Sequence, residues 1–259
     1  MVGKEPKILL VDDDELSRRM MGLLLSEKGY NYDTASNGFE AVESVQSQSY
    51  DIVLMDLQMP LMNGFDATRK IREWEAGEKH TPIVALTAML LDNEIQECMR
   101  VGMDECVAKP FDTDTLFQLI DSFVNKSKQL TPTLDSQEKE TGVALAVLDM
   151  AEALPRFSKD INIYKEFLEE FIGDLPDKIK QLRENFLSDN FKALADSAHN
   201  LKGISASMGA KQLSYLSQVL DRNSQDGDSL LIRQTLDEIE KHVLVLQGEA
   251  NHILSENTN

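Results

Sequence analysis

The sequence predicts two domains of different class: an α/β domain built on a doubly wound five-stranded parallel sheet, followed by an all-α four-helix bundle. Its 259 residues suit two small domains better than one large one, since domains typically contain about 100–200 residues. Residues 1–125 alternate short apolar runs with amphipathic stretches, a pattern typical of parallel strands covered by helices. From about residue 148 onward, apolar residues recur only at helical spacing. We therefore expect an α/β domain over residues 1–125, a linker over residues 126–147 and a bundle over residues 148–255.

Five short segments of the first domain are predicted to be strands. Three are continuous apolar runs, as expected for strands buried on both faces, and two are weaker candidates. In chain order the five are Ile8–Val11, Asn31–Ala35, Ile52–Met55, Ile83–Leu86 and Glu105–Ala108. The segments between them have helical patterns; the first, Glu15–Lys28, is followed by Gly29, a residue type that commonly ends helices. This alternation predicts the doubly wound sheet.

The second domain follows a polar stretch over residues 125–142, which contains Pro132 and shows no hydrophobic periodicity. Beyond it, long stretches with apolar residues at helical spacing are separated by short polar breaks, which favours an antiparallel four-helix bundle. A short leading helix is expected around Asp149–Phe157.

Charge and composition exclude several classes of function. Twenty-six Lys and Arg residues against 45 Asp and Glu residues give a net charge of −19. Nucleic acids and anionic membrane surfaces attract clustered Lys and Arg, so this acid excess argues against both as partners. No apolar run reaches the roughly 18–20 residues that cross a bilayer, and the N-terminus does not resemble a signal peptide, so we expect no membrane insertion and a soluble, cytoplasmic protein. The two cysteines, Cys98 and Cys106, are too few for a disulfide framework or a zinc site.

Polar side chains follow four of the five predicted strands. They are Asp12, Asp13 and Asp14 after the first strand, Asp56 after the third, Thr87 after the fourth and Lys109 after the fifth. Because ligands of doubly wound sheets bind at the carboxyl ends of the strands, we expect these groups to meet there. Each group alone is more often a helix cap or a solvated side chain. Together, crowded carboxylates require a cation, oxygen ligands without His or Cys indicate Mg²⁺, and a lysine beside the metal suits a phosphoryl group.

The motifs that contain these residues resemble a response-regulator receiver domain, which has a flavodoxin-like fold. They are ILLVDDD (8–14), DIVLMDLQMPLMNGFDATRKIR (51–72), PIVALTA (82–88) and AKPF (108–111). The resemblance covers the whole first domain. It implies that Asp56 is the phosphoacceptor, which takes a phosphoryl group from a phosphohistidine on a partner protein. It also implies that Mg²⁺ is held by Asp12, Asp13, Asp56 and the backbone carbonyl of Gln58.

By the same resemblance, Thr87 and Lys109 contact the phosphoryl oxygens, and the peptide between Lys109 and Pro110 is cis. Two positions depart from the family. Cys106 stands where members usually carry an aromatic residue that swings inward behind the threonine to switch the domain. The aromatic side chain of this usual switch is therefore missing here. Met89 stands where a side chain orients the attacking water; because methionine cannot do this, we expect a long-lived phosphoaspartate.

His199 differs from His80, His242 and His252 in its surroundings, AHNLKGISASMGA (198–210). On a helix, one stripe of this segment faces inward: Leu194, Ala198, Leu201, Ser205 and Met208. The neighbouring stripe lies at the boundary with solvent: Ala195, His199, Lys202 and Ala206. Gly203 follows one turn after His199, although glycine costs a helix about 1 kcal/mol relative to alanine. The pattern alone fits two interpretations equally: an exposed imidazole with space cleared for another protein's active site, or a half-exposed histidine beside close helix packing.

The segment HNLKGISASMGA (199–210) resembles the signature of a histidine-containing phosphotransfer (Hpt) domain, as does the preceding ALPRFSKDINIYKEFLEEF (153–171). The resemblance covers about residues 145–255. It implies that His199 is phosphorylated, that Lys202 supplies a cation near the phosphoryl group, and that the domain transfers phosphoryl groups without using ATP. The sequence contains no Gly-rich phosphate loop, so we expect a phosphoryl carrier and not an enzyme with a kinase domain.

These predictions together describe a phosphorelay intermediate. A sensor histidine kinase would phosphorylate Asp56, and His199 would exchange the group with a downstream receiver domain. The polar stretch over residues 125–142 contains 18 residues and, as a flexible chain, spans roughly 21–25 Å, which would let His199 reach Asp56 of the same chain. The alternative is a phosphorylation-gated interaction module whose Hpt domain serves a separate pathway. A DNA-binding regulator is the weakest option, because the sequence shows no basic output domain.

Overall fold

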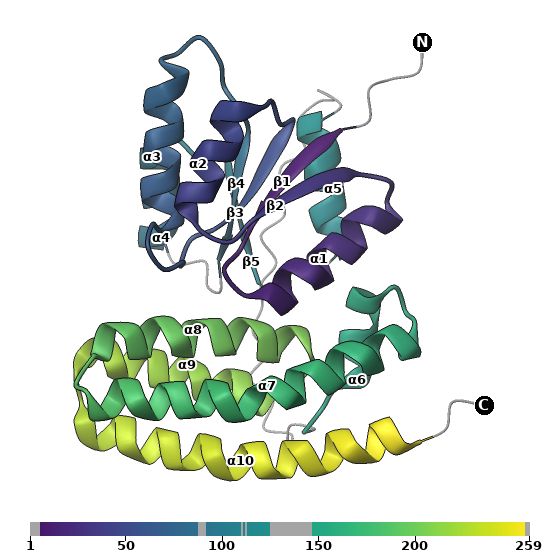
Figure 1. The fold of residues 1–259 in the computed structure, drawn as a ribbon, viewed down its shortest axis with the longest axis vertical. Helices are drawn as coiled ribbons and strands as arrows, with labels where there is room; N and C mark the ends of the chain where they lie inside the picture. Colours follow the sequence, from purple (N-terminus) through teal and green to yellow (C-terminus); the bar gives the residue numbers. More distant parts are fainter. Residues whose placement is uncertain (1–5, 88–91, 110, 112, 125–146, 257–259) are drawn as a thin grey trace.

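The computed structural model describes residues 6–87, 92–109, 111, 113–124 and 147–256. Within them the chain forms an α/β domain and a helical domain stacked on each other (Figure 1). Three expectations fall outside the described residues: the role of Met89, the peptide between Lys109 and Pro110, and all of the 126–147 linker except its last residue.

The α/β domain contains a five-stranded parallel sheet in the order β2-β1-β3-β4-β5, which confirms the predicted doubly wound sheet. Its strands are β1 (Lys7–Val11), β2 (Asn31–Ala35), β3 (Ile52–Asp56), β4 (Ile83–Thr87) and β5 (Glu105–Ala108). Its helices are α1 (Glu15–Glu27), α2 (Gly38–Ser47), α3 (Gly64–Glu75), α4 (Asp92–Val101) and α5 (Thr113–Val124). Each strand lies within one residue of its predicted bounds.

The two faces of the sheet are buried against different helices, because alternate residues of a strand point to opposite sides. Leu9 of β1 and Val53 of β3 belong to a buried cluster with residues of α2, α3 and α4. Leu10 and Leu54 belong to a second cluster, with residues of α1 and α5. Figure 1 shows these two groups of helices on opposite sides of the sheet. Burial of both faces explains why β1, β3 and β4 are continuous apolar runs.

The helical domain begins with α6 (Met150–Ala153) and a 3₁₀ turn (Leu154–Phe157), which confirms the short leading helix. Four long helices follow: α7 (Ile161–Leu187), α8 (Phe191–Ser207), α9 (Lys211–Asp226) and α10 (Ser229–Ser255). Each packs against the next, and α10 packs back against α7, so the four helices close into a bundle. The α8 residues predicted to face inward are at most 1% exposed: Leu194, Ala198, Leu201, Ser205 and Met208.

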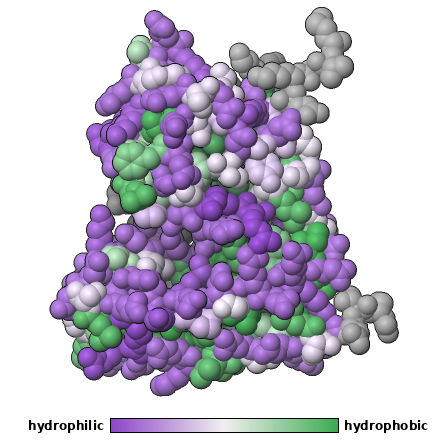
Figure 2. All heavy atoms as spheres, in the orientation of Figure 1, coloured by the Kyte–Doolittle hydropathy of each residue, from purple (hydrophilic) through white to green (hydrophobic). Residues whose placement is uncertain are grey.

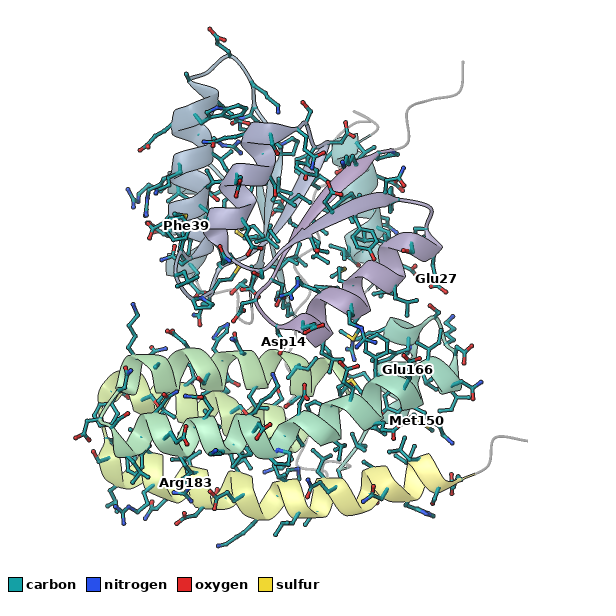
Figure 3. All side chains as sticks on the ribbon, viewed as in Figure 1. Asp14, Glu27, Phe39, Met150, Glu166 and Arg183 are labelled. Carbon is teal, nitrogen blue, oxygen red and sulfur yellow. The ribbon has the colours of Figure 1, made fainter. Side chains whose placement is uncertain are left out.

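Helix α1 joins the two domains by packing against the 3₁₀ turn and α7. Leu16 and Met20 of α1 belong to the same buried cluster as the core of the bundle. Between them, Arg19 pairs with Glu170 and lies over the Phe167 ring, 5.2 Å from its centroid. Figure 3 shows Glu166, on the same helix as Phe167, at this boundary; Glu166 also pairs with Arg19 at 3.6 Å. The domains are therefore docked through both apolar and charged contacts.

The surface of the molecule is largely polar. The face visible in Figure 2 is mostly hydrophilic, with apolar residues in small separate patches. Among the described residues, no helix combines the length and the apolar character needed to cross a membrane. The periodic apolar residues of the sequence lie mainly in three buried clusters, one on each face of the sheet and one in the bundle.

Candidate functional site

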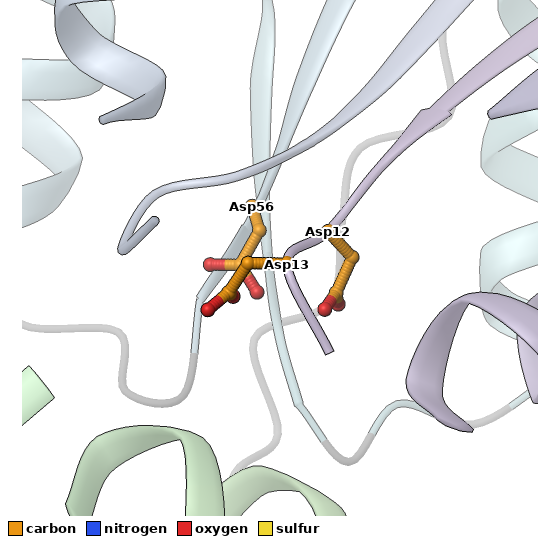
Figure 4. A group of neighbouring side chains, drawn as sticks. All are labelled: Asp12, Asp13 and Asp56. Carbon is orange, nitrogen blue, oxygen red and sulfur yellow. The ribbon is translucent and has the colours of Figure 1, made fainter. Parts of the chain in front are cut away.

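Three carboxylates meet at the carboxyl edge of the sheet, as the strand ends predict. Asp12 and Asp13 follow β1, and Asp56 is the last residue of β3. Because Val11 and Met55 are partners in the parallel register, Asp12 and Asp56 are brought side by side. One oxygen of each of the three carboxylates lies within 4.8 Å of the others (Figure 4). Asp14, the next residue, caps α1 by accepting a hydrogen bond from the Ser17 backbone nitrogen at 2.9 Å.

Burial makes this cluster unfavourable for three negative charges. It raises the pKa of Asp12 to about 7, although the Lys109 ammonium opposes the shift. Burial and the charge of Asp56 raise the pKa of Asp13 to about 6. Lys109 donates hydrogen bonds to Asp12 Oδ2, at 2.6 Å, and to Asp56 Oδ2. Although burial opposes a charge on Lys109, these two carboxylates raise its pKa above the ordinary value.

The donor set of the cluster fits a hard divalent cation. All of its side-chain ligand atoms are oxygens, which Mg²⁺ prefers. Asp13 Oδ1 is buried and makes no hydrogen bond to any described residue, a state that is unfavourable unless a cation or a donor satisfies the oxygen. The Lys109 ammonium pairs with both Asp12 and Asp56. Its single positive charge cannot balance the negative charge of three ionised carboxylates.

The other residues predicted for this edge lie around the cluster. The Thr87 side chain, at the end of β4, is buried, and its hydroxyl donates to Glu94 Oε2 of α4 at 3.3 Å. The backbone nitrogen of Gln58 donates to Asp56 Oδ1 at 2.9 Å. Cys106 of β5 is half-buried and packs against the apolar cluster on the side of the sheet that α2, α3 and α4 cover. A small side chain therefore occupies the position where the family resemblance predicts an aromatic residue.

His199 and Lys202 are more buried than the sequence predicted. Their stripe on α8 was expected at the boundary with solvent, but each residue is only 9% exposed. The reason is that the α/β domain covers this side of α8. The Nδ1 atom of His199 lies 3.1 Å from Asp221 Oδ2 of α9.

One pocket is lined by both domains. Asp12, Asp56 and Lys109 contribute from the α/β domain, and His199 and Gly203 contribute from α8. A Cβ atom added to Gly203 would meet no atom within 4 Å, so space remains beside the imidazole. Lys202 does not line this pocket; its charge acts instead on Glu94 of α4. The fold therefore brings two carboxylates of the acidic cluster, a lysine and His199 to one pocket.

Comparison with known families accounts for both halves of this site. Residues 8–121 match the family model of the response regulator receiver domain, and residues 166–248 match that of the Hpt domain. The chain therefore contains a receiver domain followed by an Hpt domain. The resemblances seen in the sequence are thereby confirmed, and the α/β domain and the bundle are called the receiver domain and the Hpt domain below.

Relatives that match most of the chain are sensor proteins. The sensor protein GacS of Pseudomonas syringae pv. syringae is 29% identical over 255 residues, which cover 96% of this chain and 28% of GacS. The aerobic respiration control sensor protein ArcB of Escherichia coli K12 is 29% identical over 211 residues, which cover 82% of this chain and 27% of ArcB. The chain thus spans little more than a quarter of the length of these relatives.

Among solved structures, the receiver domain of the sensor histidine kinase PA1611 from Pseudomonas aeruginosa PAO1 is similar to the first half of the chain. It is 34% identical, and the match covers 47% of this chain and 99% of that one with a TM-score of 0.44. That structure has a magnesium ion coordinated in its active site cleft.

Two polar contacts at the site join the Hpt domain to the acidic loop of the receiver domain, residues 12–14. Asn200, next to His199, donates a hydrogen bond from its side-chain nitrogen to Asp13 Oδ2 at 2.7 Å. Lys178 of α7 binds Asp14 Oδ2 at 2.7 Å. Although burial alone would raise the pKa of Asp14, the Lys178 ammonium lowers it below the ordinary value. Figure 3 shows Asp14 at the start of α1, facing the bundle.

Sequence reasoning missed Asn200, Lys178, Asp221 and Glu94. Asn200 lies 187 residues from its partner Asp13, and nothing in a local pattern reports such a contact. Asp221 is only weakly indicated by the sequence: an acidic residue on a helix that packs beside a candidate histidine is a plausible hydrogen-bond partner of that histidine. That signal becomes usable only once the packing of α8 against α9 is known.

Proposed function

We propose that the chain is a phosphorelay intermediate of a two-component system. In this proposal Asp56 accepts a phosphoryl group from the phosphohistidine of a sensor histidine kinase. His199 then takes the group from Asp56 and exchanges it with the aspartate of another receiver domain. The observation that carries the proposal is that Asp56 and His199 line one pocket between the two domains. The same pocket favours the relay over a module whose Hpt domain serves a separate pathway.

The receiver side of the transfer rests on residues at the carboxyl edge of the sheet. When a carboxylate oxygen of Asp56 attacks phosphorus, the bond between phosphorus and the donor nitrogen breaks, and negative charge spreads over the phosphoryl oxygens. Lys109, held between Asp12 and Asp56, is placed to bind one of those oxygens. The hydroxyl of Thr87 is proposed to bind another, which requires it to leave Glu94.

Mg²⁺ is the proposed cofactor. Asp12, Asp13, Asp56 and the backbone carbonyl of Gln58 would hold it, and when bound it would offset the charge of the carboxylates and of the phosphoryl group. The oxygen-only donor set supports this assignment, as does Asp13 Oδ1, to which none of the described residues donates a hydrogen bond.

The Hpt side of the transfer rests on α8. His199 lines the pocket, and Gly203 leaves space beside its ring for a phosphoryl group. Lys202 is proposed to supply positive charge near the phosphorylated imidazole, where it now faces Glu94. The contacts of Asn200 and Lys178 with the acidic loop would hold the two carriers together during transfer.

Labelling with a small acyl phosphate as donor tests the relay. The wild-type chain should carry base-labile label on Asp56 and acid-labile label on His199. Asp56→Asn should lose both, and His199→Gln should lose only the acid-labile label. Asp66→Asn, at an exposed position of α3, is the matched control and should label like the wild type. Undiminished label on His199 in Asp56→Asn would reject the relay in favour of a separate donor for the Hpt domain.

A further inference from the structure

Glu94 of α4 lies between the phosphoryl-accepting edge of the receiver domain and the Hpt domain. Its side chain is half-buried, and its Oε2 accepts a hydrogen bond from the Thr87 hydroxyl at 3.3 Å. On the Hpt side, His199 and Lys202 of α8 favour its charge through space, whereas Asp221 of α9 opposes it. Burial raises the pKa of Glu94, so its carboxylate is stabilised by any further donor or positive charge. Glu94 therefore connects Thr87 with the charges of α8.

The Thr87 hydroxyl can donate to only one acceptor at a time, because it carries a single proton. In the proposed relay it donates to a phosphoryl oxygen on Asp56, so it must leave Glu94. The proton stays on Thr87 Oγ1 and no covalent bond changes; only the acceptor is exchanged. The half-buried Glu94 carboxylate then loses a donor, which is unfavourable unless another partner replaces it. Lys202 is a nearby partner of the required charge.

The position of Cys106 gives this exchange a consequence. The family resemblance places an aromatic residue there that responds to the threonine, and the cysteine side chain cannot make that movement. Glu94 lies in the same neighbourhood, since its charge acts on the Cys106 thiol through space. Unlike Cys106, Glu94 contacts the Thr87 hydroxyl directly and carries a charge that reaches the other domain.

We infer that Glu94 is a positioning residue that links phosphorylation of Asp56 to the Hpt domain: it holds the Thr87 hydroxyl before phosphorylation and pairs with Lys202 afterwards. This inference rests on the proposed relay. The exchange strengthens the contact between α4 and α8 when Asp56 carries a phosphoryl group, and so favours the docked state when His199 has a group to accept. It also slows phosphorylation of Asp56, because the hydrogen bond to Glu94 must break first.

The rate of phosphorylation tests the first half of the inference. A small acyl phosphate with Mg²⁺ is the donor, in chains that also carry His199→Gln, so that the group stays on Asp56. We expect Glu94→Ala to be phosphorylated about fivefold faster, the factor that corresponds to one modest hydrogen bond. Glu94→Gln should gain no more than about twofold, because its amide oxygen still accepts from Thr87. Glu97→Gln is the matched control on the same helix, where Glu97 pairs with two arginines, and should react at the parent rate.

A double-mutant cycle tests the second half. Glu94→Gln, Lys202→Gln and the double variant are compared in the same His199→Gln background, and docking is measured by fluorescence energy transfer between dyes on the two domains. The coupling between the two charges should be at most about twofold before phosphorylation of Asp56 and about fivefold after it. A cycle isolates this pair from every other effect of the phosphoryl group on docking.

The outcomes separate this inference from the relay itself. A parent rate of phosphorylation in Glu94→Ala, or a coupling to Lys202 that phosphorylation leaves unchanged, would overturn the role of Glu94 and leave the relay intact. A chain with its native His199 that is phosphorylated on Asp56 but never on His199 would overturn the relay, and the rates would still report on the contact of Glu94 with Thr87. Equal acceleration in Glu97→Gln and Glu94→Ala would assign the effect to the net charge of α4 and reject positioning.

Discussion

The side-chain amide of Asn200 in the Hpt domain donates a hydrogen bond to Asp13 in the receiver domain, over 2.7 Å. The contact joins the residue next to His199 with a carboxylate of the proposed Mg²⁺ site. It also means that the docked arrangement depends on the charge of the acidic cluster. Domain docking and cation binding at the acidic cluster should therefore influence each other, because both equilibria involve Asp13 and are thermodynamically linked.

Asn200→Asp places a second carboxylate opposite Asp13 and should weaken docking in the absence of divalent cations. We expect the docked population to fall by at least about tenfold in EDTA, since like charges across an interface are strongly unfavourable. Mg²⁺ should restore much of the docking by offsetting the charge of Asp13. Fluorescence energy transfer between dyes on the two domains measures this, with Asn251→Asp on the exposed side of α10 as control. Equal loss with and without Mg²⁺ would contradict the expectation.

Arg19→Glu should weaken the same interface from α1. It removes the pairs with Glu170 and Glu166 and the contact with the Phe167 ring, and replaces them with repulsion. Because the Arg19 side chain is 41% exposed, solvent screens the effect; we expect docking to weaken about fivefold, the equivalent of about 1 kcal/mol. Adding Glu170→Arg should recover part of the loss. Arg69→Glu on α3, also at an exposed ion pair, should have no effect on docking.

Gly203 allows a test of whether space beside His199 matters for transfer. Alanine fits, because an added Cβ meets no atom within 4 Å. Gly203→Ala should therefore increase the free energy of unfolding by up to about 1 kcal/mol and leave transfer from Asp56 to His199 unchanged. Gly203→Leu should also fold, but its side chain would enter the shared pocket and slow transfer. Urea unfolding and single-turnover labelling measure the two effects; equal transfer rates in both variants would show that the space is not needed.

His242 should make the bundle less stable at mildly acidic pH. Its Nε2 is buried without a hydrogen-bond partner among the described residues, and burial lowers its pKa below the ordinary value. Between that ordinary value, about 6.5, and the lowered one, the unfolded chain binds a proton that the folded chain does not. The free energy of unfolding should therefore fall as pH decreases through this window. His242→Leu should make the dependence shallower between pH 7.5 and 5.5 in urea titrations; an unchanged slope would refute this.

Docking of both carriers in one chain predicts transfer within the chain. The half-time from phosphorylated Asp56 to His199 should stay constant on dilution, because the pocket already contains both residues. A mixture of His199→Gln and Asp56→Asn chains gives a sharper test, since only transfer between chains can label His199 there. Such labelling should be slow and should increase with concentration. Labelling as fast as in the wild type would show that the domains act between chains.

The sequence determines the fold closely because its signals are local. Continuous apolar runs locate β1, β3 and β4 to within a residue, and their neighbouring positions in the sheet bring Asp12 and Asp56 together. The exposure of His199 was predicted wrongly for a physical reason. The periodicity of α8 reports which side faces the bundle core, but it carries no information about a second domain that covers the other side. The contacts of Lys178 and Asn200 with the acidic loop depend on that docking, so they could not be predicted from the sequence for the same reason.

The receiver domain covers the face of α8 that carries His199, and in the proposed relay this would limit how fast a phosphoryl group is passed on. A phosphoryl group on His199 would be shielded from water and from unrelated receiver domains for as long as the two domains remain together. A recipient would gain access only after they separate, so each delivery would require one separation event. The lifetime of the docked state would then set the maximum throughput of the relay, and changes in that lifetime would adjust signalling speed without altering the chemistry at either carrier.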